Sequence, residues 1–284
     1  MKLSFFKTFK ELAINTSILA IFFVFICTIT LILYLRVSTL GENDDPGFIT
    51  KNPNEYREID AIPILLYHDI DGNGPYSITK EQLRKHFEFF RLNNIDVISL
   101  KELIRLQHEN RSPENKSVVI TVDDGYISAY TKILPLMQEF DYPVTLFIYT
   151  NFIFEKSDKH MTWTMLKEME KYGFDIQSHT VSHADLVKLI GKGDTESLNS
   201  IEYELTQSKK IIEDKLDKEV TLLAFPYGYY TPKLLDMARN SGYIKTFSTD
   251  YGANISLHSN YCYRRHHIKK DFNETNLKKI IQMR

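Results

Sequence analysis

The sequence is poor in cysteine and nearly neutral in net charge. Its two cysteines, Cys27 and Cys262, lie far apart in the 284 residues, so we expect no structural disulfide, and they do not fix the redox compartment. The formal net charge of −2 gives no electrostatic basis for binding nucleic acid. The sequence contains no internal repeat and no low-complexity segment. Its 43% hydrophobic content over this length is ordinary for a globular protein with one large domain or two small ones.

A long apolar run lies near the N-terminus. Ile18 to Leu35 is interrupted only by two threonines and is about long enough to cross a bilayer as a helix. Three lysines precede it, which favours a cytoplasmic N-terminus with the rest of the chain outside the cell membrane. Cleavage after the helix would instead give a secreted protein. The expected organisation is a cytoplasmic N-terminus at 1–12, a transmembrane signal anchor at 13–36, a linker at 37–60 and a globular domain at 61–284.

The globular part alternates between strand-like and helix-like patterns. Apolar, β-branched runs predict strands at 62–67, 95–98, 118–122, 144–149, 174–177, 220–225 and 242–247. Amphipathic spacing predicts helices at 79–92, 100–108, 127–140, 162–172, 197–216, 232–240 and 273–282. This alternation predicts an α/β fold with a parallel sheet, either open or closed.

The central predicted strand ends in two carboxylates. It reads V-V-I-T-V-D-D-G, in which Val118 to Val122 is apolar apart from one threonine, and Asp123, Asp124 and Gly125 follow. Adjacent carboxylates at the end of a buried strand are costly unless a metal or a catalytic partner balances them. Taken alone, D-D-G is also a common turn sequence.

Three other predicted strands also end in polar or unusual residues. His68 follows the first strand, His179 and His183 follow the fifth, and Pro226-Tyr227-Gly228 follows the sixth. In parallel α/β folds the reactive groups gather at the carboxyl ends of the strands. We therefore expect these four clusters to form one site.

The chemistry of these residues favours a metal. Two imidazoles four residues apart can bind one ion if the segment turns helically, although H-x-x-x-H alone is a weak signal in a chain with nine histidines. Two histidines with one aspartate leave open positions for water on zinc, nickel, cobalt or iron. Such an ion acidifies water and polarises a carbonyl, and the second aspartate could then act as general base.

The motifs T-V-D-D-G, H-T-V-S-H and F-P-Y-G, in this order and spacing, resemble those of the polysaccharide deacetylases with a NodB homology domain, carbohydrate esterase family 4. The opening P-I-L-L-Y-H-D-I resembles the branch that deacetylates poly-β-1,6-N-acetyl-D-glucosamine, the intercellular adhesin of biofilms. The resemblance covers residues 61–284. It implies a distorted (β/α) barrel with fewer than eight strands, and metal-dependent N-deacetylation of an extracellular N-acetylglucosamine polymer with release of acetate.

The resemblance also implies a role for each motif residue. Asp124, His179 and His183 would bind a divalent metal ion, zinc being the first expectation. Asp123 would be the base that activates water. The backbone N–H of Tyr227 would stabilise the oxyanion, for which a backbone donor is suited. His68 would be the general acid that protonates the leaving amine.

Two departures from the family pattern make the acid less certain than the metal site. Leu223, Ala224 and Phe225 stand where the family usually has an arginine, and no late Leu-x-His follows F-P-Y-G. His266 or His267 is the rival acid, although a strand would point the two to opposite faces. Arg265 could pair with Asp123 and keep it ionised, but we favour a solvated basic patch.

Aromatic residues beside the motifs are candidates for binding sugar: Trp163, Tyr67 and Tyr126. Packing is an equally good role for the single tryptophan. Chitin oligomers, peptidoglycan and acetylated xylan are alternative substrates, and a non-catalytic carbohydrate-binding module is an alternative function. A glycosidase is disfavoured because adjacent carboxylates cannot flank a scissile bond. The sequence does not set the oligomeric state.

Overall fold

The computed structural model describes residues 61–154, 158–252, 254 and 261–282. The predicted cytoplasmic segment, signal anchor and linker lie outside these residues. In the part of the chain that is described, no helix has the length and apolar character needed to cross a membrane.

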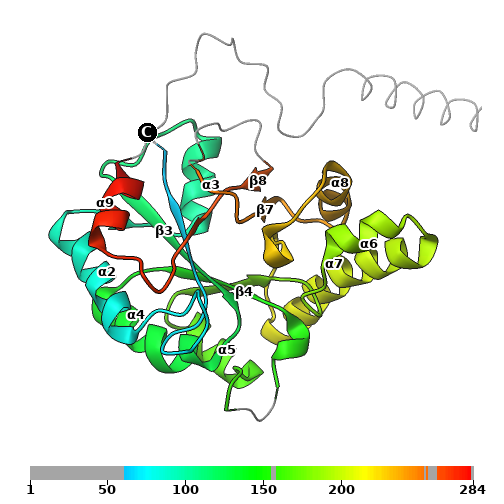
Figure 1. Cartoon of the computed structure of the whole chain (residues 1–284), viewed down its shortest axis with the longest axis horizontal. Coiled ribbons are helices and arrows are strands. Elements are labelled where there is room, and N and C mark those ends of the chain that lie inside the picture. The colour runs from blue at the N-terminus through cyan, green and yellow to red at the C-terminus, as the bar shows by residue number, and fades with distance from the viewer. Residues whose placement is uncertain (1–60, 155–157, 253, 255–260, 283–284) are drawn as a thin grey trace, which may run out of the picture. The chain divides into compact units, whose positions relative to one another are not determined.

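A curled sheet of parallel strands forms the centre of the fold, as the alternating pattern predicts. The sheet order is β8-β7-β6-β5-β4-β3-β1-β9, with β2 beside β3. The strands are β1 (Ile64–Tyr67), β2 (Asp96–Val97), β3 (Ser117–Asp124), β4 (Val144–Ile148), β5 (Phe174–Ser178), β6 (Leu222–Ala224), β7 (Lys245–Phe247), β8 (Cys262–Tyr263) and β9 (His266–His267). In Figure 1, β3 and β4 run between α2 and α4 on one side and α6 to α8 on the other.

The two outermost strands of this sheet belong to one extended segment. Residues 262–267, which we call the closing segment, first pair with β7 through Tyr263 and Phe247 and then with β1 through His266 and Leu65. The segment therefore connects the two edges of the curled sheet, and Figure 1 shows it crossing from β7 towards α9. The fold is a half-barrel completed by one short strand segment.

Eight α-helices of the described residues pack against the sheet, and all except α4 begin at a side-chain cap. They are α2 (Lys80–Leu92), α3 (Leu100–His108), α4 (Leu134–Phe140), α5 (Trp163–Glu170), α6 (Leu186–Lys192), α7 (Thr195–Leu216), α8 (Pro232–Asn240) and α9 (Glu274–Ile281). Thr79, for example, accepts a hydrogen bond from the Gln82 N–H and thereby satisfies a donor that the first turn leaves unpaired. Helix α6, which begins at the cap Asp185, is absent from the sequence prediction. The predicted helix at 127–140 is a π-helix, Ala129–Ile133, followed by α4.

Alternation along the strands creates two cores. In β3, Val118, Ile120 and Val122 belong to the large core shared with the outer helices. Val119 belongs to a second core, which also contains Phe147, Phe247 and three leucines of α3. Because side chains alternate between faces, Asp123 shares the inward face of Val119. The catalytic candidate thus sits above an apolar floor inside the curled sheet.

Truncating Leu83 tests how α2 covers the sheet. Leu83 is 1% exposed, so Leu83→Ala should lower the free energy of unfolding by about 2–5 kcal/mol through the cavity that it leaves. Leu92 on the same helix is 79% exposed, and Leu92→Ala should change stability by only about 0.5 kcal/mol. Chemical denaturation of the full-length chain, followed by circular dichroism, measures both. Equal effects would contradict the packing described.

Candidate active site

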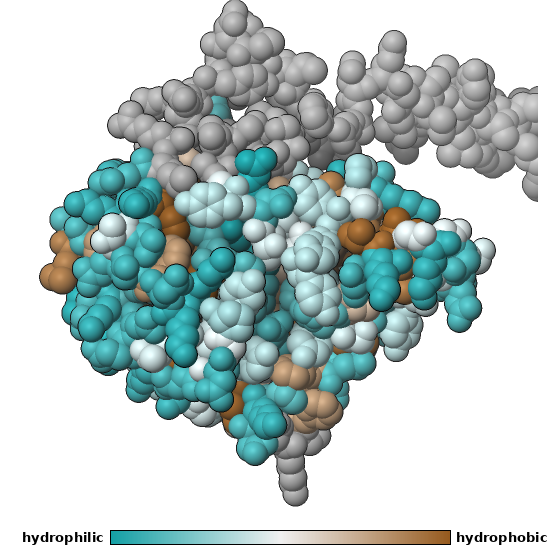
Figure 2. All heavy atoms as spheres, viewed as in Figure 1, coloured by the Kyte–Doolittle hydropathy of each residue, from teal (hydrophilic) through white to brown (hydrophobic). Residues whose placement is uncertain are grey.

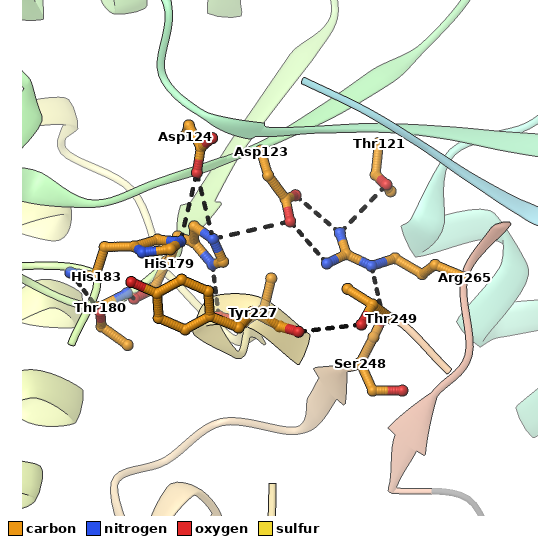
Figure 3. A network of polar contacts seen from close by, with 12 residues as sticks. Thr121, Asp123, Asp124, His179, Thr180, His183, Tyr227, Ser248, Thr249 and Arg265 are labelled. Atoms are coloured by element: carbon orange, nitrogen blue, oxygen red, sulfur yellow. Dashed lines mark hydrogen bonds and ion pairs between the residues drawn. The ribbon is translucent and has the colours of Figure 1, made fainter. Parts of the chain in front are cut away.

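Arg265 of the closing segment forms a buried ion pair with Asp123. Its two terminal nitrogens donate to the two carboxylate oxygens over 2.8 and 2.7 Å, and its Nε donates to the Ser248 carbonyl oxygen (Figure 3). The Arg265 side chain is fully buried. The prediction of a solvated basic patch is therefore wrong, and the alternative, pairing with Asp123, is what the structure shows.

This pair sets the charge of Asp123. Burial by itself would raise the pKa of the carboxyl, but the guanidinium of Arg265 outweighs burial, and the pKa is lowered to about 2. The guanidinium also lies over the rings of Phe147 and Phe247, at 5.5 and 5.9 Å from their centroids. Asp123 is thus a carboxylate at any ordinary pH, held in one orientation by a bidentate partner.

Asp124 lies beside His179 and His183. Its Oδ1 is 3.6 Å from the Nε2 atom of each histidine, and the ligand atoms of the three residues all lie within 4.8 Å of one another (Figure 3). Strict strand alternation would point Asp124 away from Asp123. Its φ of 80° turns the chain at the strand end, so both carboxylates approach His179.

The donor atoms fit a divalent cation. The Nδ1 of His179 is 2.8 Å from the carbonyl oxygen of Ala224, which assigns the proton to Nδ1 and leaves the Nε2 lone pair directed at Asp124. Burial lowers the pKa of His179 to about 4, so its imidazole is neutral. Burial and then the neighbouring Asp123 charge raise the pKa of Asp124 to about 7. A bound cation would relieve this crowding of negative charge.

The loop that carries His179 and His183 is not helical. The sequence analysis expected a helical turn to bring these two histidines onto one ion. Thr180 and His183 adopt left-handed conformations with φ of 73° and 59°. Glu204 of α7 holds the loop between them: it accepts hydrogen bonds from the backbone N–H groups of Val181 and Ser182 over 2.8 and 2.9 Å, and from the Ser182 hydroxyl. Glu204 is buried.

Glu204 is not among the residues singled out from the sequence, although it lies in the helix predicted at 197–216. The available signal is a charged residue within the apolar stripe of the helix. Ile201, Leu205 and Ile212 are buried on the same side as Glu204. A carboxylate at such a position needs buried donors, and the loop provides them.

His68 lies among the groups that surround Asp123. Burial lowers its pKa to about 4, while the charge of Asp123 acts in the opposite direction. Its ring is 5.4 Å from that of Tyr76 and 5.1 Å from that of His267. His266 instead packs against Tyr251, so the expectation that only one of the late histidines faces the site agrees with the structure.

Tyr227 places its backbone beside the metal-ligand candidates. Its φ is 60°, and its ring meets that of His183 edge-on at 4.6 Å. Its carbonyl oxygen accepts a hydrogen bond from the Thr249 hydroxyl. Gly228 follows with φ of 73°, and a Cβ there would lie 2.3 Å from the Thr249 nitrogen, so only glycine fits this turn.

The three predicted sugar-binding residues have different environments. Tyr67 is 1% exposed and its hydroxyl contacts His86, so the prediction that it lines the cleft is wrong. The inward-facing position next to it is taken by Leu66, and Tyr67 points to the helix side. Tyr126 is half-buried, and burial followed by the charge of Asp124 raises its pKa, which places it near the site. Trp163 packs against the large core, as the packing alternative states.

With this geometry established, comparison with known proteins shows which family the chain resembles. The family model described as polysaccharide deacetylase matches residues 110–245, which include both aspartates, both histidines and Tyr227. These 136 of the 284 residues match the polysaccharide deacetylases. This family consists of hydrolases that act on amide bonds of acetylated sugars. His68 and Arg265 lie outside the matched residues.

Individual polysaccharide deacetylases resemble the chain over different lengths. YxkH of Bacillus subtilis (strain 168), named as a polysaccharide deacetylase, is 28% identical over 68% of this chain and 66% of its own length, slightly under two thirds. The poly-β-1,6-N-acetyl-D-glucosamine N-deacetylase of Staphylococcus aureus (strain MRSA252) is 24% identical over 84% of this chain and 89% of its own. The Streptococcus pyogenes deacetylase PplD, solved with acetate, has a TM-score of 0.71 at 24% identity and covers 80% of this chain and 100% of its own, which shows the shared fold.

Replacing Arg265 by methionine tests the control of Asp123. Without the guanidinium, burial should raise the pKa of Asp123, by about 3–5 units for a fully buried group. The acid limb of the pH profile of kcat/KM should therefore move to higher pH, with at least a tenfold loss at pH 7 (about 1.4 kcal/mol) that recovers as pH rises. Arg264 is exposed and adjacent, and Arg264→Met is the control. A parallel loss at every pH would contradict this role.

Two substitutions of Glu204 test how the histidine loop is held. Glu204→Ala removes three acceptor contacts and should weaken zinc binding by about 10–100-fold, the range for partners that orient metal ligands. Glu204→Gln keeps an oxygen for the two N–H groups and an amide for the Ser182 hydroxyl, and should retain most of the affinity. Competition with a chromophoric chelator measures zinc binding, and the exposed Glu202→Ala is the control. Unchanged affinity in Glu204→Ala would overturn the assignment.

Proposed function

We propose that this protein is a membrane-anchored, metal-dependent polysaccharide deacetylase that removes acetyl groups from poly-β-1,6-N-acetyl-D-glucosamine outside the cell. The observation that carries the proposal is the position of Asp123: an ionised, buried carboxylate beside the cluster of Asp124, His179 and His183. Similarity to the Staphylococcus aureus enzyme over most of both chains supports the polymer. The apolar run before residue 37 supports the membrane location.

The residues divide the reaction between them. The cluster of Asp124, His179 and His183 would hold a divalent cation, which when bound supplies Lewis-acid polarisation of the acetamide carbonyl and of the attacking water. Asp123 takes a proton from that water as it attacks the carbonyl carbon. The Tyr227 N–H donates to the oxygen on which negative charge develops.

His68 completes the reaction by protonating the leaving nitrogen. With a pKa of about 4 it is neutral at rest. Negative charge on the tetrahedral intermediate raises the pKa of a nearby imidazole, so His68 takes up a proton from solvent as the intermediate forms and gives it to the amine as the C–N bond breaks, while Asp123 returns its proton to solvent. Acetate and a free amine result, and the protonated amines make the polymer cationic and able to adhere to anionic surfaces.

The rival functions explain the site less well. A carbohydrate-binding module has no need of a carboxylate whose charge is fixed by a buried arginine. A glycosidase needs two carboxyl groups on opposite sides of a glycosidic bond, whereas Asp123 and Asp124 both approach His179, with oxygens 3.9 and 3.6 Å from its Nε2. Chitin oligomers, peptidoglycan and acetylated xylan remain the alternative substrates.

Asp123→Asn separates catalysis from metal binding. The variant should lose about 10²–10⁴-fold in acetate release, the usual contribution of a general base, while it still binds zinc through the three other residues. Because Arg265 then loses its charged partner, thermal unfolding is measured alongside to show that the variant is folded. Shortened sugar chains in the wild-type reaction would favour a glycosidase instead.

Substrate and metal are tested with the full-length protein. Poly-β-1,6-N-acetyl-D-glucosamine and chitin oligomers are supplied in parallel, first with a chelator and then with added zinc. Release from the β-1,6 polymer alone, lost with chelator and restored with zinc, is the expected result. Release from chitin alone would keep the mechanism and discard the assigned polymer.

A further inference from the structure

A cavity of about 550 Å³ adjoins the proposed catalytic groups. Arg265 and His267 line it, and these residues respectively bind Asp123 and lie against His68. The cavity therefore starts at the base and the acid of the proposed reaction. Its volume lies within the range of about 300–1,000 Å³ that is usual for ligand pockets.

One wall of the cavity comes from alternate residues of a single extended stretch. Arg265, His267 and Lys269 line it from alternate positions, whereas the buried His266 and Ile268 lie between them, and Asp271 lines it from the turn that follows. This is the period of two that an extended chain imposes on its side chains. The wall thus begins at the fully buried Arg265 and ends at the exposed Lys269 and Asp271.

Two tyrosine rings also line the cavity. Tyr76 and Tyr251 both line the cavity and are 39% and 60% exposed. The ring of Tyr76 stacks on that of His267, with centroids 4.5 Å apart and planes at 21°. The ring of Tyr251 meets His266 edge-on at 4.6 Å. Both tyrosines are thereby positioned while still presenting ring surface to solvent. Figure 2 shows residues of intermediate hydropathy gathered at the middle of one face.

Backbone hydrogen bonds hold both loops that supply these tyrosines. The Lys270 N–H donates to the carbonyl oxygen of Pro75, next to Tyr76. The Arg265 N–H donates to the carbonyl oxygen of Asp250, next to Tyr251. The cavity is therefore largely preformed, which lowers the entropy cost of binding.

We propose that this cavity is a subsite for a sugar unit next to the one that loses its acetyl group, an inference that rests on the proposed function. A pyranose ring has apolar C–H faces and a rim of hydroxyl groups, which matches a cavity lined by both tyrosine rings and polar side chains. Lys269 and Asp271 carry opposite charges, so the wall favours a neutral ligand over an anion or a polycation. Among the described residues, the buried Nε2 of His267 has no hydrogen-bond partner.

The subsite predicts that activity depends on chain length. Initial rates are measured on β-1,6-linked N-acetylglucosamine oligomers of two to six units. In the wild type, kcat/KM should rise with length, and in Tyr251→Ala the ratio between the hexamer and the dimer should fall at least fivefold. Tyr172→Ala, which removes a tyrosine that is 49% exposed outside the cavity, is the control and should keep the wild-type ratio. An unchanged ratio in Tyr251→Ala, or equal losses on all lengths, would overturn the subsite.

Binding without turnover separates this inference from the proposed function. Calorimetry with chelator-treated protein and the hexamer should show binding that Tyr251→Ala weakens about tenfold and Tyr172→Ala does not. If the wild type releases no acetate but this difference in binding is present, the subsite holds and the proposed reaction fails. If the two variants bind the hexamer equally, the subsite is wrong whatever the activity.

Discussion

The ion pair between Asp123 and Arg265 is the constraint on which the site depends. A carboxylate that is 1% exposed needs a partner, and here the partner comes from a residue 142 positions later in the chain. Because Arg265 lies in the closing segment, Asp123 is paired only after the segment has joined β7 to β1. A buried ion pair often stabilises a fold no more than an apolar pair of the same size does. The role of this pair in the chemistry of the site therefore explains its presence better than a contribution to stability does.

Unusual backbone conformations bring the remaining groups together. Among the described residues, nine other than glycine have positive φ, and six of these are aspartate or asparagine, which tolerate it. The other three, Thr180, His183 and Tyr227, all belong to the proposed site. Strain of this kind persists only where neighbouring contacts enforce it, and Glu204 and Thr249 supply such contacts to the histidine loop and to Tyr227. The geometry of the site thus depends on residues that take no part in the chemistry.

Features of the structure could be predicted from the sequence where neighbouring residues cause them, and could not where residues far along the chain cause them. The strand from Val118 onwards, its two aspartates and the polar ends of three other strands follow from apolar runs and from the rule that parallel strands end on one edge. Arg265 was predicted to be solvated because no residue near it in the sequence indicates that it pairs with Asp123. Tyr67 was placed in the cleft because adjacency to His68 was taken as proximity, although alternation sends neighbours to opposite faces. Glu204 was missed for the same reason as Arg265, since its partners lie 22 and 23 residues away.

The closing segment links catalysis to recognition of the polymer. Its inner residues are fixed: Arg265 by Asp123, and His267 by the rings of His68 and Tyr76. Its continuation at Lys269 and Asp271 is exposed and makes no contact with the proposed metal ligands in the described structure. Substitutions at these outer positions can therefore change which sugar neighbours are accepted without moving the base. Because Arg265, His267 and Lys269 occupy alternate positions of one extended stretch, the residues needed for the reaction and the first residue free to vary with specificity lie on the same face.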